Sequence, residues 1–168
     1  CNNTNWGHVA SKVWNILDEE GFFQEHTGIM FAGQEVMKYS DEKNEYYFVP
    51  TDIALCLDYD RFLPYMNANF ADFDMSAMVT WHEGTHAPEN VLTVHSLGDG
   101  KSGVFTKANP RFMRNLLLAY EKNRIELGLE QYHVATEATH WSGVHDGEGN
   151  PNLLIEYPVP MVDIEVGS

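Results

Sequence analysis

Apolar side chains recur at helical spacing in two segments of the chain. The first covers residues 10–20, where four apolar residues form one face, and Gly21 follows it. The second covers residues 109–127, and it opens with an asparagine–proline pair that suits an N-cap and a first helical position. Gly128 follows as a stop signal. The pattern therefore predicts two amphipathic helices.

Shorter apolar segments predict strands. Residues 35–39 and 45–49 flank a polar stretch, which is typical of a β-hairpin, whereas residues 51–65 fit neither pattern clearly. Four more segments are short, apolar and rich in β-forming residues: 75–81, 91–94, 132–138 and 161–166. Strands that alternate with helices predict an α/β fold, with a mostly parallel sheet and flanking helices.

Length and composition add few constraints. The 168 residues and the 43% hydrophobic content are typical of one globular domain, which we expect to span residues 1–168. No apolar run reaches the length of about 18 residues that a membrane helix needs, and no secretory signal is visible. Two cysteines are too few for a disulfide framework, which favours a reducing compartment and a cytoplasmic location.

The net charge of −15 argues against a protein that coats nucleic acid with a broad basic surface. Six of the ten basic residues nevertheless fall between positions 101 and 124, where Glu121 is the only acid. These are Lys101, Lys107, Arg111, Arg114, Lys122 and Arg124. The segment suits either a partner that carries phosphates or an ordinary solvated helix face.

The segment from His82 to His86 reads HEGTH and fits a zinc-protease motif. That chemistry needs both histidines on one helix face, with Glu83 beside the metal. The surrounding threonines, tryptophan and glycine are poor helix formers, and Pro88 would end a helix almost at once. Leu92 stands where the extended motif has a third histidine. The sequence therefore favours an accidental match, and a zinc peptidase stays open as an alternative.

Histidines also follow three of the predicted strands: His82, His95 and His140. The fourth strand contains Glu165 near its end, and Glu137 lies close to His140 in the chain. Ligands of open α/β sheets bind outside the carboxyl ends of the strands, so we expect these side chains to converge in one crevice. The alternative is that the histidines occupy unrelated places.

The segments TWH, LTVHSLGD, YHVATEATHWSG and MVDIEVGS, in this order, resemble the archaeal and plant type of D-aminoacyl-tRNA deacylase. The positions that match the family pattern are His82, His95, Glu137, Thr139, His140, Glu165, Gly167 and Ser168. Trp141 stands where the family has a second histidine. Family members also begin with a further strand and continue beyond the glycine–serine pair, so the chain would be a fragment or a shortened relative.

The resemblance implies a peptidyl-tRNA-hydrolase-like or phosphorylase-like core, Zn²⁺ as cofactor and hydrolysis of the ester of D-aminoacyl-tRNA. It implies metal ligands at His82, His95, His140 and Glu165, and catalytic roles for Glu137, Thr139 and His140. A variant without metal would use His140 as the base and Thr139 to place the ester. Expected substrate-binding residues are Trp141, Lys107, Arg111 and Arg114.

Aminoacyl-tRNA is the expected partner, with no membrane contact, and a monomer is favoured while the oligomeric state stays open. Trp141 could instead be a core aromatic residue. Because an indole neither binds metal nor moves protons, a catalytically degenerate relative that binds a nucleotide or RNA is a further alternative.

Overall fold

The computed structural model describes residues 4–31, 33–50, 59–82, 88–99, 103–140, 150 and 152–167. The predictions for Trp141, for Ser168 and for Glu83 to His86 lie outside these residues. The chain divides into two compact units, Cys1–Cys56 and Leu57–Ser168. The prediction of one domain over residues 1–168 stays a prediction.

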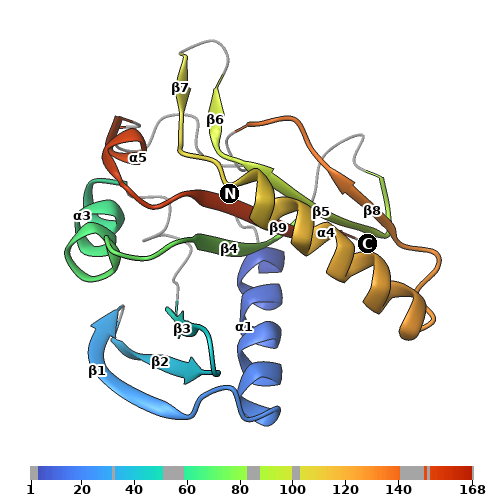
Figure 1. The fold of residues 1–168 in the computed structure, drawn as a ribbon, viewed down its shortest axis with the longest axis horizontal. Coiled ribbons are helices and arrows are strands. Elements are labelled where there is room, and N and C mark those ends of the chain that lie inside the picture. The colour runs from blue at the N-terminus through green and yellow to red at the C-terminus, as the bar shows by residue number, and fades with distance from the viewer. Residues whose placement is uncertain are drawn as a thin grey trace. The chain divides into compact units, whose positions relative to one another are not determined.

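The first unit contains helix α1 (Thr4–Glu19) and an antiparallel sheet in the order β1-β2-β3 (Figure 1). The strands are β1 (Glu25–Phe31), β2 (Gln34–Ser40) and β3 (Glu45–Phe48). The predicted helix and hairpin are confirmed. The side chain of Asp41 accepts hydrogen bonds from two backbone N–H groups of the turn, those of Lys43 and Asn44 (both 2.8 Å). Strand β1 was not predicted.

The second unit is built on a four-stranded sheet in the order β4-β9-β5-β8. Its strands are β4 (Ser76–Trp81), β5 (Val91–Ser96), β8 (His133–Thr136) and β9 (Met161–Gly167). β4 pairs with β9, and β5 with β8, in parallel. The central pair of β5 and β9 is antiparallel. A mostly parallel sheet is therefore confirmed for this unit.

The antiparallel central pair corrects the prediction about strand ends. β4 and β9 end at one edge of the sheet, whereas β5 and β8 end at the opposite edge. His82, His95 and His140 therefore do not follow strand ends at a common edge. Any cluster of these side chains has to form across a face of the sheet.

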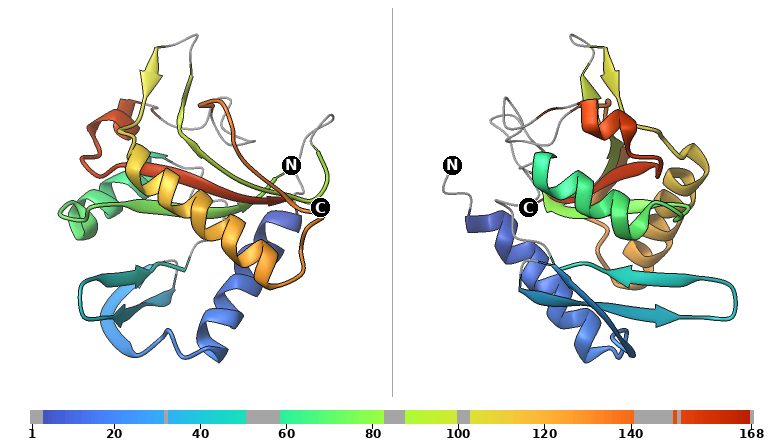
Figure 2. Two further views of the ribbon diagram at one scale, coloured as in Figure 1. Left: turned by 45° about the vertical axis from the view of Figure 1, so that its right-hand side comes forward. Right: turned by 90° about the vertical axis from the view of Figure 1, so that its left-hand side faces the viewer.

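Helices and a small hairpin complete the second unit. They are α3 (Tyr59–Phe70), α4 (Pro110–Glu126), α5 (Asn152–Glu156) and the strands β6 (Gly98–Asp99) and β7 (Val104–Phe105). The hairpin of β6 and β7 extends away from the four-stranded sheet (Figures 1 and 2). The peptidyl-tRNA-hydrolase-like or phosphorylase-like character of the core stays a prediction.

Helix α4 begins where the sequence predicts, because the side chain of Asn109 accepts a hydrogen bond from the N–H of Phe112 (3.0 Å). The helix packs along β5 and β8 with a half-buried apolar face. Across the residues that the structure describes, no helix has the length and apolar character that a membrane crossing requires.

Candidate active site

One face of the four-stranded sheet carries buried polar side chains in place of apolar ones. Strand pairing sets Glu165 of β9 between Thr80 of β4 and Thr93 of β5, and sets Asp163 beside His95. Because alternate residues of a strand point to the same face, all five share one face. All five are buried. Burying polar groups lowers the free energy of unfolding unless they are paired, so these residues indicate a functional site.

His82 reaches this face from the end of β4. Its backbone N–H donates to the carbonyl oxygen of Val166 (3.0 Å), which extends the pairing with β9 by one residue. Gly167 makes room for it, since a Cβ there would lie 3.1 Å from both Cβ and Nδ1 of His82. The Nε2 atom of His82 lies 3.1 Å from Oε1 of Glu137.

Glu137 comes to the same face from β8. Its backbone N–H donates to Val94 O (3.3 Å) and so continues the pairing of β8 with β5 beyond Thr136. Its second carboxylate oxygen, Oε2, lies 3.9 Å from Nε2 of His140. Glu137 therefore stands between two histidines, His82 and His140.

His95 and His140 stack face to face, with ring centroids 3.9 Å apart and an interplanar angle of 21°. A parallel β-bridge joins Leu97 to His140 and holds the two segments together. The hydroxyl oxygens of Ser96 and Thr139 lie 2.7 Å apart and form a second link. The predicted residue Thr139 is thus tied to Ser96, which the sequence did not single out.

Backbone carbonyls fix the orientation of both stacked rings. Nδ1 of His95 lies 3.1 Å from Ser96 O, and Nδ1 of His140 lies 2.7 Å from Ala138 O. A carbonyl oxygen accepts but cannot donate, so each Nδ1 carries the proton. Each Nε2 is left facing a carboxylate, and for His95 this is Glu165 Oε1 at 3.3 Å.

Several polar atoms of the site are buried and lack hydrogen-bond partners in the described part of the chain. They are Nδ1 of His82, the hydroxyl of Thr93 and both carboxylate oxygens of Asp163; Oε1 of Glu137 has the close contact with His82 but no hydrogen bond of good geometry. Glu165 is better satisfied, because the hydroxyl of Thr80 donates to its Oε1 (3.4 Å). The site therefore holds buried acceptors that the described protein groups leave unpaired.

Burial and charge shift two pKa values in this cluster. Burial raises the pKa of Asp163 to about 7, although His95 opposes the rise. Burial lowers the pKa of His95, but its contacts with Glu165 and Asp163 outweigh this effect and leave the pKa above its ordinary value. The cluster thus favours a positive charge at the His95 ring.

The predicted metal ligands fall into two groups that share Glu165, and His82 belongs to a different group from His95 and His140. Nitrogen and oxygen atoms of His95, His140 and Glu165 lie within 4.8 Å of one another, and so do those of His82, Glu137 and Glu165. Imidazole nitrogens and carboxylate oxygens are common zinc ligands. Nδ1–H groups that donate to backbone carbonyls typically orient metal-binding histidines. The donor set fits a divalent cation, and its role as a metal site stays a prediction.

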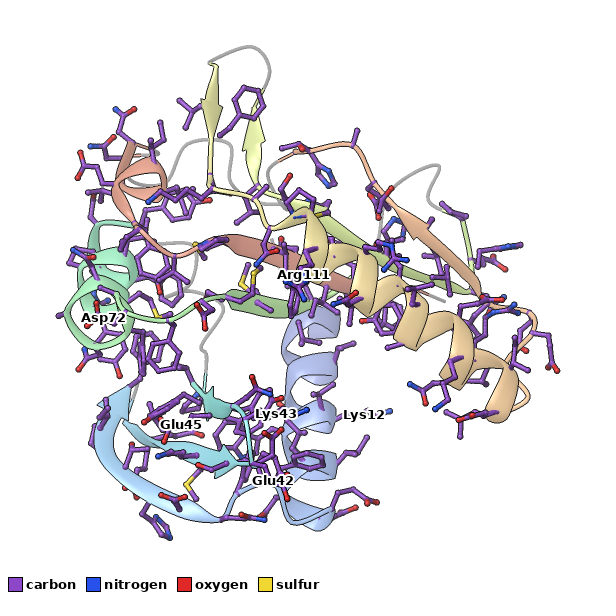
Figure 3. The ribbon with its side chains drawn as sticks, in the orientation of Figure 1. Lys12, Glu42, Lys43, Glu45, Asp72 and Arg111 are labelled. Carbon is purple, nitrogen blue, oxygen red and sulfur yellow. The ribbon has the colours of Figure 1, made fainter. Side chains whose placement is uncertain are left out.

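The predicted substrate-binding residues lie elsewhere in the second unit or outside the described residues. Arg111 (Figure 3) and Arg114 are exposed on α4, and neither forms an ion pair with another described residue. Lys107 precedes the helix and donates to the carbonyl oxygen of Pro158 (3.0 Å). Of the HEGTH segment, the structure describes His82 alone, which follows a strand.

The chain is similar to known proteins in sequence and in fold. A family model described as D-aminoacyl-tRNA deacylase matches residues 69–168, which include every member of the cluster. A crystal structure of a conserved protein of unknown function is similar in fold, with a TM-score of 0.60 and 18% sequence identity. The match covers 99% of this chain and 52% of the other, so this chain spans about half its length. No curated protein matches the chain.

Proposed function

The chain belongs to the D-aminoacyl-tRNA deacylase family, and we propose that it hydrolyses the ester bond of D-aminoacyl-tRNA, releasing the D-amino acid and free tRNA. The observation that carries this proposal is the buried cluster of histidines and carboxylates on one face of the sheet. Aminoacyl-tRNA is the class of substrate that the family implies, and the preference for the D-amino acid is part of the proposal.

Ester hydrolysis needs a water that loses a proton and a group that stabilises the developing oxyanion. Glu137 is one candidate base, because its two oxygens lie near Nε2 of His82 and Nε2 of His140. Glu165 is a second candidate, and the hydroxyl of Thr80 orients its carboxylate. His140 is half-buried and is the candidate base if no cation takes part.

We also propose that the cluster binds Zn²⁺ through His82, His95, His140 and Glu165. The unpaired buried acceptors and the orientation of the two Nε2 atoms support a cation at this place. A divalent cation would supply Lewis acidity, which activates water and polarises an ester carbonyl. The protein side chains would position the substrate and move the protons.

Substrate placement would involve groups around the cluster. Thr139 is exposed beside His140, and its hydroxyl, linked to Ser96, is suited to contact the ester. Arg111, Arg114 and Lys107 would contact tRNA phosphates, which position a nucleic acid without specifying its sequence. Trp141 would stack on a base or on an aromatic aminoacyl group.

The test is hydrolysis of D-tyrosyl-tRNA and of L-tyrosyl-tRNA by the wild type and by the Glu137→Gln and His140→Ala variants, with casein as a control. We expect the wild type to release D-tyrosine faster than L-tyrosine, and both variants to be slower. Cleavage of casein would favour a peptidase. Binding of tRNA without turnover would favour a degenerate relative and would overturn the proposal.

A further inference from the structure

Asp163 is the least satisfied charged residue of the described site. It lies on β9, the strand between β4 and β5, paired with Met78 on one side and His95 on the other. Its exposed fraction is 0%. Neither of its carboxylate oxygens has a hydrogen-bond partner among the residues that the structure describes. Neither the sequence nor the family pattern singled it out.

Folding alone does not explain a carboxylate in this position. An ionised group that is buried without donors costs far more than a neutral side chain of the same size. Asparagine has nearly the same shape and no charge, so it would fit the space at lower cost. A buried carboxyl group without hydrogen-bond donors among the described residues points to a role in the site.

The geometry around His95 shows what that role is. The ring is fixed by Nδ1–H at Ser96 O, so Nε2 points inward and offers a lone pair to a cation when the ring is neutral. That atom faces two acceptors, Glu165 Oε1 at 3.3 Å and Asp163 Oδ2 at 3.9 Å. Three acceptors directed at one place repel one another unless a positive species lies among them, which is a protonated His95 ring or, when that ring is neutral, a bound cation.

We propose that Asp163 is a positioning residue that acts through His95 and strengthens the binding of a divalent cation by the cluster. The inference rests on the cation site of the proposed function. Asp163 is not itself in either set of three donor residues, whereas His95 and Glu165 share one. Its negative charge, close to Nε2 of His95, favours a cation bound there and keeps the ring turned toward the site.

The experiment compares the wild type with Asp163→Asn, which keeps the shape of the side chain and removes the charge. The zinc dissociation constant of the full chain is measured by competition with a coloured chelator. The melting temperature is measured after metal removal. We expect zinc binding to weaken by about 10- to 100-fold. The melting temperature of the metal-free variant should be equal to or above that of the wild type, because an unpaired buried charge has been removed.

Val162→Thr is the matched control, because Val162 is buried next to Asp163 on β9 with its side chain on the opposite face of the sheet, outside the cluster. Its zinc affinity should equal that of the wild type. Asp163→Ser serves as a second variant, with a smaller side chain and the same expectation. A lower melting temperature with unchanged zinc affinity would show a purely structural role and overturn the proposal, as would failure of both Asp163 variants to fold.

Failure of this inference can be told apart from failure of the proposed function. If the wild type hydrolyses D-tyrosyl-tRNA but binds no zinc, the role of Asp163 is wrong and the deacylase proposal stands. If Asp163→Asn weakens zinc binding while the wild type hydrolyses no aminoacyl-tRNA, the inference stands and the deacylase proposal is wrong.

Discussion

The two units each contain a histidine paired with a glutamate, and the two pairs differ in their surroundings. In the first unit, Nδ1 of His26 lies 2.8 Å from Oε2 of Glu35, with side chains 77% and 29% exposed. In the second unit, Nε2 of His95 lies 3.3 Å from Glu165, with side chains 0% and 6% exposed. The residue types are the same in both pairs, and the pairs differ in how deeply their side chains are buried.

The polar groups around the two pairs also differ. Glu35 accepts a second hydrogen bond, from the N–H of Gly28 (2.7 Å), and water reaches His26. His95 instead faces Asp163 as well as Glu165, and Asp163 has no donor in the described part of the chain. A surface pair contributes little to stability, whereas a buried pair with an excess of acceptors is costly. Buried polar groups without partners, more than residue types, therefore identify the candidate site.

The largest expected effect is the loss of catalysis in Glu165→Gln. Glu165 belongs to both sets of three donors, so the amide would weaken both at once. We expect kcat on D-tyrosyl-tRNA to fall by about 100-fold or more. Single-turnover hydrolysis measures the effect, with Val162→Thr, on the opposite face of the sheet, as a control that should keep wild-type activity. Wild-type turnover in Glu165→Gln would show that the buried pair of His95 and Glu165 has no role in catalysis.

The second prediction concerns the space that Gly167 leaves for His82. In Gly167→Ala the new Cβ would lie 2.8 Å from Cγ1 of Val91 and 3.1 Å from the His82 ring atom Nδ1. We expect a loss of about 1–3 kcal/mol in the free energy of unfolding and about a tenfold loss of activity. Denaturant unfolding and hydrolysis of D-tyrosyl-tRNA measure the two effects.

A double variant separates the two clashes of Gly167→Ala. Adding Val91→Ala removes the contact with valine and leaves the contact with His82. Stability should then recover in part, while activity should stay low. Full recovery of activity would show that the displacement of His82 does not matter for catalysis.

Local signals predicted the elements whose structure depends on nearby residues. The cap at Asn109 fixes the start of α4, and the polar turn around Asp41 fixes the hairpin of β2 and β3. Helix α3 was left open, and a proline at position 64 interrupts its pattern. Strand β1, whose register shifts between His26 and Met30, also escaped prediction.

The direction of β9 relative to β5 could not be predicted, because it depends on residues about 70 positions apart, such as His95 and Asp163. The family pattern nevertheless identified the residues of the cluster. Asp163 was missed, although it lies two residues before Glu165 in an otherwise apolar strand. Strand alternation alone places both carboxylates on one face, and this signal would have found it.

The third prediction compares basic side chains of the two units by their acidic neighbours. Lys38 of the first unit has two acidic neighbours, Glu45 at 2.7 Å and Glu25 at 3.8 Å. Arg111 and Arg114 form no ion pair with a described residue, so they are suited to bind phosphates. For the double variant Arg111→Gln/Arg114→Gln, we expect KM for tRNA substrates to rise several-fold with little change in kcat.

The salt dependence of binding supplies the control. Each lost phosphate contact should lower the slope of log affinity against log salt by about 1. Lys122→Gln should have less effect, because Lys122 lies 3.8 Å from Glu126. If the double variant and Lys122→Gln behave alike, the basic residues of α4 form an ordinary solvated face.

The smallest effect is expected at the surface pair of the first unit. The hydrogen bond from His26 lowers the pKa of Glu35 below its ordinary value of 4.5, and the backbone N–H of Gly28 lowers it further. A depressed carboxyl pKa contributes stability above the pKa of the unfolded state, and this contribution is lost as the pH falls through the lower folded value. Carboxyl chemical shifts in an NMR titration should therefore give Glu35 a midpoint below 4.5. In His26→Ala the midpoint should rise but stay below the ordinary value, because Gly28 still donates.

Hydrolysis of D-tyrosyl-tRNA should be unchanged in His26→Ala, since the pair of His26 and Glu35 lies outside the cluster. A fall in activity as large as that of Glu165→Gln would contradict the division between a surface pair and a functional one.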